Sequence, residues 1–71
     1  MNIESTVSGL VLEILVAPGD EIAIDQEVMI VEAMKMEIPI AAETAGTVDA
    51  ILVAQGDIIQ EGDVLVALKP A

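Results

Sequence analysis

With 71 residues the chain is long enough for one small domain, which we expect to span residues 1–71, and the absence of cysteine excludes disulfides and thiolate metal sites. Thirteen acidic side chains against two basic ones give a net charge of −11, which excludes the clustered Lys and Arg that nucleic acid or an anionic membrane requires. No basic segment precedes an apolar stretch at the amino terminus, and apolar runs are far shorter than a spanning helix. We therefore expect a cytoplasmic protein that binds neither nucleic acid nor membrane.

The composition and the turn residues predict an all-β domain. Apolar residues make up 55% of the chain, mostly Ile, Val, Leu and Ala, and there is no aromatic residue. Branched side chains favour strands, and no long segment repeats its apolar residues with the period of a helix. In chain order, a strand beginning near Gly9 leads to a turn at residues 17–20, and a second turn follows at Asp25-Gln26.

The second half of the chain repeats the first with an offset of 37 residues. The identical pairs are Gly9/Gly46, Val11/Val48, Ile14/Ile51, Leu15/Leu52, Val16/Val53, Ala17/Ala54, Gly19/Gly56, Asp20/Asp57 and Ile22/Ile59. The second turns also correspond, with Asp25 in the place that Gly62 has in the later copy. Because Asp tolerates a left-handed backbone better than most residues, we expect two copies of one supersecondary unit, turns included.

The two units are expected to pack face to face. The apolar positions Val11, Ile14 and Val16 are spaced three and then two residues apart, which breaks strict alternation and predicts a β-bulge. Neither unit can bury its apolar face alone, so the predicted fold is a flattened antiparallel β-sandwich with pseudo-twofold symmetry. We expect Val16 and Val53 to be buried alike, and the middle of the chain to lie at the end opposite the two termini.

The middle of the chain must reverse direction without any of the usual turn residues. Residues 28–40 contain no Gly, Asn or Asp, and their only proline is Pro39. A strand through all of them would far exceed the usual length of about five to six residues. We therefore predict a tight reversal near Met34-Lys35. Such a departure from normal hairpin chemistry is typical of a functional site.

Lys35 is one of two basic residues and lies within the motif Glu32-Ala33-Met34-Lys35-Met36. The chain has no histidine and no cysteine that could make it a catalytic group. We interpret this lysine as an amine presented to another protein for modification, although a solvated surface lysine between two strand methionines is the plainer alternative. The run resembles the biotin attachment sequence of biotin carboxyl carrier proteins. The resemblance covers residues 9–68.

The resemblance implies a fold and a function. Biotinyl and lipoyl carrier domains are barrel-sandwich hybrids of two quasi-symmetric four-stranded sheets, with the modified lysine at an exposed hairpin tip. Lys35 would carry biotin through an amide, and Glu32, Ala33, Met34 and Met36 would form the motif recognised by biotin protein ligase. Biotin carboxylase would then carboxylate the biotin, and a carboxyltransferase would pass the carboxyl group on. An acetyl-CoA or other acyl-CoA carboxylase is the expected setting.

Two other functions remain open on the sequence. Lipoyl domains of 2-oxo acid dehydrogenase-type complexes share this fold, but they usually have an Asp before the lysine, where this chain has Met34. A purely structural β-domain is the second alternative. An enzyme is not expected, because the chain has no glycine-rich phosphate loop and no metal-ligand spacing. One departure from the carriers is residues 6–9, where both prolines of a Pro-Met-Pro-Gly-like segment are missing and Gly9 alone is kept.

Overall fold

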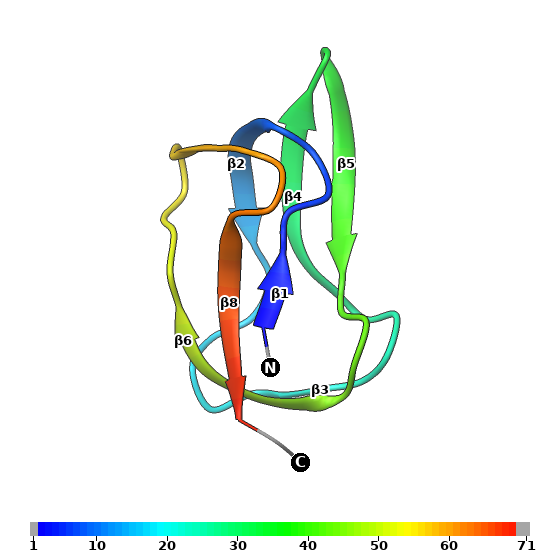
Figure 1. Ribbon diagram of the computed structural model, residues 1–71, viewed down its shortest axis with the longest axis vertical. Helices are drawn as coiled ribbons and strands as arrows, with labels where there is room; N and C mark the ends of the chain where they lie inside the picture. The colour runs from blue at the N-terminus through cyan, green and yellow to red at the C-terminus, as the bar shows by residue number, and fades with distance from the viewer. Residues whose placement is uncertain (1, 70–71) are drawn as a thin grey trace.

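The computed structural model describes residues 2–69, which form eight strands in two antiparallel sheets (Figure 1). The strands are β1 (Asn2–Glu4), β2 (Gly9–Ile14), β3 (Glu21–Ile22), β4 (Glu27–Ala33), β5 (Met36–Ala41), β6 (Gly46–Ile51), β7 (Ile58–Ile59) and β8 (Val64–Lys69). One sheet has the order β1-β8-β6-β3 and the other the order β5-β4-β2-β7. Across these residues there is no helix of the length and apolarity needed to cross a membrane. The predicted all-β fold of two four-stranded sheets is confirmed.

The duplication in the sequence is a duplication in the structure. An offset of 37 residues carries β2, β3 and β4 onto β6, β7 and β8, and carries β1 onto the end of β5. The two strand orders match under this offset, strand for strand. Equivalent hydrogen bonds also recur: the Leu15 N–H donates to the Val28 carbonyl over 2.9 Å, and the Leu52 N–H donates to the Leu65 carbonyl over the same distance. The predicted pseudo-twofold symmetry is therefore confirmed.

The turns are built as the sequence predicts. Asp25 has a φ of 70° where Gly62 has 91°, so both occupy the left-handed region that favours glycine. The side chains of Asp20 and Asp57 close the preceding turns, each carboxylate accepting a hydrogen bond from the backbone N–H three residues earlier, over 2.9 and 2.8 Å. These local bonds fix where each strand ends and hence the register of both sheets.

The predicted β-bulge is present in both copies. The register shifts between Val11 and Glu13 in the first copy and between Val48 and Ala50 in the second. The core lies between the sheets, and its fully buried side chains include Val11, Val28, Met29, Val31, Val48, Ile59, Leu65 and Val66. The expected equivalence of Val16 and Val53 is wrong, because Val16 is buried and Val53 is only half-buried.

Two glycines let neighbouring strands approach closely. A Cβ atom at Gly9 would lie 2.2 Å from the backbone oxygen of Glu32, and one at Gly46 would lie 2.9 Å from that of Lys69. These pairs are equivalent under the duplication. The approach is tighter at Gly9, where β2 supports the strand that leads to the lysine motif. Gly9, which this chain shares with the Pro-Met-Pro-Gly-like segment of the carriers, therefore has a steric role.

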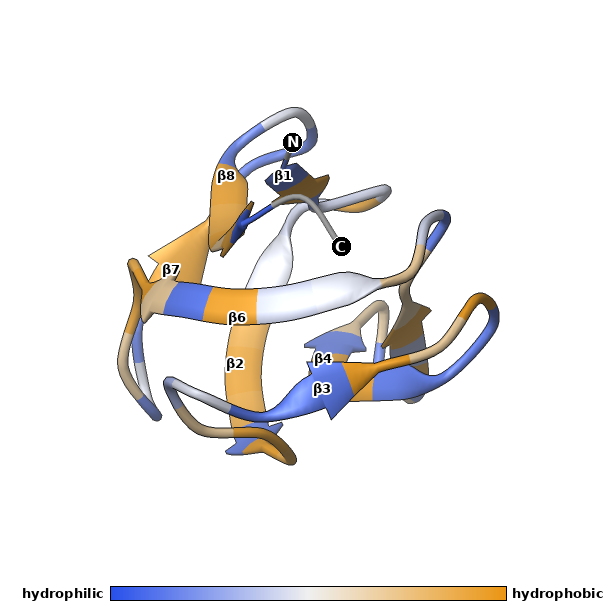
Figure 2. Cartoon of the chain, turned by 90° about the horizontal axis from the view of Figure 1, so that it is seen from below, coloured by the Kyte–Doolittle hydropathy of each residue, from blue (hydrophilic) through white to orange (hydrophobic). Residues whose placement is uncertain are grey.

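The domain is elongated, with extents of 34, 19 and 19 Å. The β4–β5 hairpin occupies one end of the long axis, while β8 runs to the opposite end and β1 starts in the half remote from the hairpin (Figure 1). Viewed from that remote end, β3 is hydrophilic at its first residue and hydrophobic at its second (Figure 2). The chain ends themselves, Met1 and Ala71, lie outside the described residues, but Asn2 and Lys69 have the predicted placement away from Lys35.

Candidate functional site

The lysine motif forms the tip of the β4–β5 hairpin. Ala33 pairs with Met36, which leaves Met34 and Lys35 as a two-residue loop. Their φ angles are 53° and 64°, and positive φ at both central residues is what a type I′ hairpin turn requires. Asn or Gly normally fills these positions, and a left-handed non-glycine residue costs about 1–2 kcal/mol. The predicted reversal is confirmed, and the chain maintains it against backbone strain.

Strand pairing and burial of the β4–β5 hairpin offset the backbone strain of the turn. β4 and β5 are paired from Glu27↔Ala41 to Ala33↔Met36, with one register shift between Glu27 and Met29 at the end remote from the turn. β4 also pairs with β2 on its other side. The inward side chain Val31 is fully buried and Ala33 is 8% exposed, so the core anchors β4 almost to the turn. The lysine turn thus follows directly from a paired and buried strand.

The structure exposes four of the five motif residues. Met34 is 94% exposed and Met36 is 64% exposed, although apolar side chains are normally buried. Lys35 and Glu32 are exposed as well, whereas Ala33 is buried beneath the turn. The two methionines therefore flank the amine with exposed apolar surface. Ala33 is placed to support the hairpin.

Truncating either methionine tests whether this apolar surface serves recognition. We expect Met34→Ala and Met36→Ala to change the free energy of unfolding by less than about 0.5 kcal/mol, because exposed side chains contribute little to stability. If the methionines form the recognition motif that the resemblance implies, both variants should nevertheless be modified more slowly by biotin protein ligase. Urea denaturation and a biotinylation time course provide the two measurements. A stability loss of roughly 2–5 kcal/mol, as for a buried methionine, would show that these side chains belong to the core.

The tip offers one kind of chemistry, an accessible primary amine. The residues around it, Met34, Met36 and Glu37, are all exposed, so nothing encloses the amine in a catalytic pocket. Among residues 2–69 no cluster of three or more His, Cys, Asp or Glu side chains could hold a metal ion. Lys69 has a different setting at the far end of β8, where its Nζ lies 3.7 Å from the Asp49 carboxylate. The two lysines are therefore distinguished by geometry and by flanking residues.

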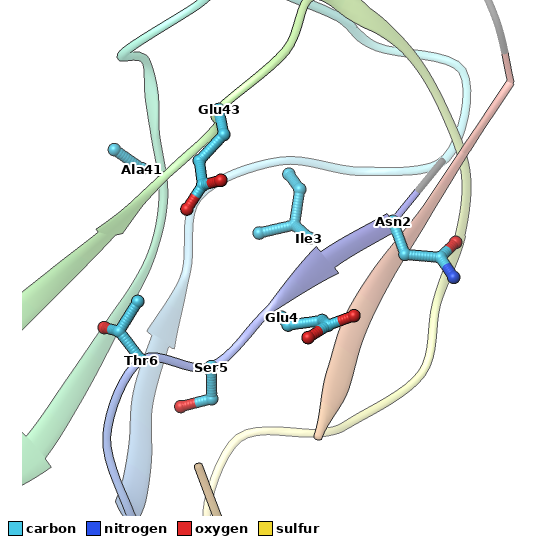
Figure 3. A pocket seen from close by; sticks show the side chains of 7 residues that line it. All are labelled: Asn2, Ile3, Glu4, Ser5, Thr6, Ala41 and Glu43. Carbon is cyan, nitrogen blue, oxygen red and sulfur yellow. The ribbon is translucent and has the colours of Figure 1, made fainter. Parts of the chain in front are cut away.

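A cavity of about 280 Å³ lies away from the motif, between β1 with the residues after it and the end of β5 (Figure 3). Its lining residues are Asn2, Ile3, Glu4, Ser5, Thr6, Ala41 and Glu43. Buried Ser5 donates a hydrogen bond to the Val7 carbonyl, so its hydroxyl is satisfied by the chain itself. No sequence motif indicates this cavity, because it forms where the two halves meet. It contains none of the motif residues.

The structure thus places an exposed lysine on a strained turn at one end of a duplicated eight-stranded sandwich. The family model described as "Biotin-requiring enzyme" matches residues 1–68. The chain therefore belongs to this biotin-requiring family, and the resemblance seen in the sequence is confirmed. Biotin is the cofactor that the description of this family names.

Curated relatives match over most of the chain. A biotin/lipoyl attachment protein of Bacillus subtilis is 43% identical over 69 residues, which cover 97% of this chain and 94% of the relative. A biotin carboxyl carrier protein of Streptococcus mutans is 47% identical over 60 residues, covering 84% of this chain and 46% of the relative. The dihydrolipoyllysine-residue acetyltransferase component of a pyruvate dehydrogenase complex from Azotobacter vinelandii is 36% identical and is covered over 10% of its length.

Solved structures with the same fold are parts of much larger proteins. A single-chain, multi-domain long-chain acyl-CoA carboxylase matches with a TM-score of 0.91 and 25% identity, over 100% of this chain and 7% of the carboxylase chain. The urea carboxylase of Kluyveromyces lactis matches with a TM-score of 0.90 and 30% identity, over 97% of this chain and 6% of the enzyme. The chain thus has the fold and size of one small part of each of these carboxylases.

Proposed function

We propose that this protein is a biotin carboxyl carrier that bears biotin in amide linkage to the Nζ of Lys35. The observation that supports this most strongly is the placement of Lys35 on an exposed, strained two-residue turn between two exposed methionines. An exposed amine with no enclosing wall fits a covalent adduct, because the adduct meets no steric conflict within the domain. Membership of the biotin-requiring family supports biotin as the adduct.

The residues of the chain position the cofactor and do not catalyse. Bound biotin supplies a ring nitrogen that can carry a carboxyl group. The hairpin holds the Lys35 amine away from the sandwich, so that a partner can enclose it from several sides. A lysine amine is mostly protonated at neutral pH, so amide formation requires a ligase that supplies an activated biotin. A rigid domain bearing a flexible arm then keeps the carried group at high effective concentration near partner active sites.

The proposed setting is a biotin-dependent acyl-CoA carboxylase. The partners are then biotin protein ligase, biotin carboxylase and a carboxyltransferase, with Glu32, Ala33, Met34 and Met36 as the motif that the ligase recognises. An acyl-CoA carboxylase among the structures of the same fold supports this choice. In this proposal residues 1–71 form a single non-catalytic domain that works in the cytoplasm.

A lipoyl carrier is the second candidate, and the similarity to a dihydrolipoyllysine-residue acetyltransferase component favours it. The two candidates differ in what the modified chain can accept. Incubated with biotin carboxylase, ATP and radiolabelled bicarbonate, the modified chain should acquire label that is lost in acid. A modified chain that remains unlabelled, but is reductively acylated by a 2-oxo acid dehydrogenase, would instead identify a lipoyl carrier.

A further inference from the structure

The outer faces of the two sheets differ, although their strands correspond residue by residue. On the sheet that carries the lysine hairpin, the outward positions Leu10, Leu12, Ile30 and Ile58 are apolar; their equivalents on the other sheet are Thr47, Asp49, Ala67 and Glu21. These apolar side chains alternate with buried neighbours such as Val11, Val31 and Ile59, and none of them belongs to the core cluster or packs against it. The difference between the two sheets in these residues therefore concerns their outer faces and not the core.

The apolar positions continue in register toward the lysine. Ile58 pairs with Leu10, Leu10 pairs with Glu32, and Glu32 pairs with Glu37, so one row of side chains crosses all four strands. In the next row Glu13 lies opposite Ile30. The face thus has apolar side chains on β7, β2 and β4, with Glu32 and Glu37 on the hairpin side and Glu13 farther from the turn on β2. Glu32 is three residues before the proposed attachment site.

The strand pairing does not require apolar side chains at these positions. The equivalent strands of the other sheet pair in the same order with polar residues in the same places. Ile58 is 77% exposed and gains almost nothing from burial within the domain. Leu10, Leu12 and Ile30 are half-buried, so they form with exposed Ile58 a partly exposed apolar surface. Such a surface with a polar border is typical of one that binds another protein. A second copy of this chain does not suit it, because the acidic borders of two copies with a net charge of −11 would repel each other.

We infer that this outer apolar face, defined by Leu10, Leu12, Ile30 and Ile58 and bordered by Glu13, Glu32 and Glu37, docks onto biotin carboxylase. The inference rests on the proposed carrier function. The matching surface of the partner is an apolar patch bordered by Lys and Arg. ATP and bicarbonate are both anions, so an enzyme that binds them has positive potential near its active site, complementary to these carboxylates.

The length of the arm favours the carboxylase over the ligase as the occupant. The ligase acts on the bare lysine, whose side chain is short, so it must close on the turn itself. After modification the arm is longer by the valeryl chain and rings of biotin. The carboxylase can therefore reach the end of the arm while it holds the domain farther down, beside the hairpin, where Leu10 and Ile58 lie.

The duplication supplies the test variants. Ile58→Glu and Leu10→Thr copy the residues Glu21 and Thr47 that the equivalent strands of the other sheet already carry. Ile24→Glu copies Glu61 in the same way and is the matched control, because Ile24 is a 61% exposed apolar residue ahead of β4 at the remote end. It adds the same charge as Ile58→Glu. Each full-length variant is first biotinylated by ligase and verified by mass, and then titrated as substrate of biotin carboxylase from the same organism with ATP and bicarbonate.

We expect Ile58→Glu to raise KM for the biotinylated carrier about tenfold or more, since the substitution removes apolar area from the interface and places a charge there. Leu10→Thr should raise KM less, kcat should stay within about twofold, and Ile24→Glu should match wild type. Equal KM values for Ile58→Glu and Ile24→Glu would overturn the inference. If Ile58→Glu slowed biotinylation and left KM unchanged, the face would belong to the ligase and the inference would be overturned. It would also be overturned if the only effect of Ile58→Glu were to dissociate a dimer of the carrier. Failure of wild type to become biotinylated would refute the carrier function itself.

Discussion

Replacing Lys35 by arginine should abolish biotin incorporation. The substitution keeps the positive charge and the unbranched side chain at the exposed turn, so the fold is expected to be unchanged. Guanidinium remains protonated at all relevant pH values and cannot form the amide. Incubation with ligase, biotin and ATP, followed by streptavidin detection, should give the signal of a reaction without ligase.

Lys69→Arg is the matched control for this experiment. Lys69 is exposed, but it lies in β8 at the remote end beside Asp49, and no methionines flank it in the sequence. This variant should be biotinylated at the wild-type rate. Its ion pair with Asp49 is solvent-exposed and worth at most about 1 kcal/mol, so stability should also be retained. Persistent labelling of Lys35→Arg, with loss of labelling in Lys69→Arg, would transfer the attachment site to Lys69.

Gly9→Ala should be the most damaging small substitution in the domain. Its Cβ would lie 2.2 Å from the Glu32 backbone oxygen and 2.9 Å from the Val31 Cγ1 atom. The first contact is with backbone, which cannot move aside without displacing β4. We expect a loss of about 3 kcal/mol or more of unfolding free energy, at the upper end of overpacking effects, measured by urea denaturation.

Gly46→Ala is the natural comparison, because the duplication places it in the equivalent position. Its Cβ would lie 2.9 Å from the Lys69 oxygen, so a smaller shift of β8 relieves the contact. The expected loss is about 1–2 kcal/mol. If Gly9→Ala proved as stable as wild type, or less damaging than Gly46→Ala, the close approach of β2 to β4 would not be a constraint on the hairpin.

The architecture could be predicted from the sequence because the signals for it are local and occur twice. A register of 37 residues aligns the turns, so each copy supports the interpretation of the other. Asp25 in the place of Gly62 predicted a left-handed turn, and the spacing of Val11, Ile14 and Val16 predicted a bulge. Both are set by steric rules that act within a few residues. Packing between the two sheets then follows from which residues alternate.

The features that could not be predicted from the sequence depend on tertiary contacts, which local sequence rules do not describe. The reversal was placed at Met34-Lys35 by strand length alone, and only the structure shows that both residues take positive φ. The burial of Ala33 and the partial exposure of Val53 depend on which chain segments cover each sheet end. The outer apolar face likewise emerges only when the register brings Ile58 and Leu10 together. The attachment role of Lys35 stays a prediction.

Trypsin digestion and mass spectrometry of the chain purified from its native organism test that role most directly. Trypsin cuts after an unmodified lysine but not before proline, and Lys69 precedes Pro70, so cleavage reports on Lys35 alone. The carrier function predicts a fraction that resists cleavage and carries the added mass of one biotinyl group, located on Lys35 by fragmentation. A lipoyl group on Lys35, or biotin on Lys69 with Lys35 unmodified, would contradict it.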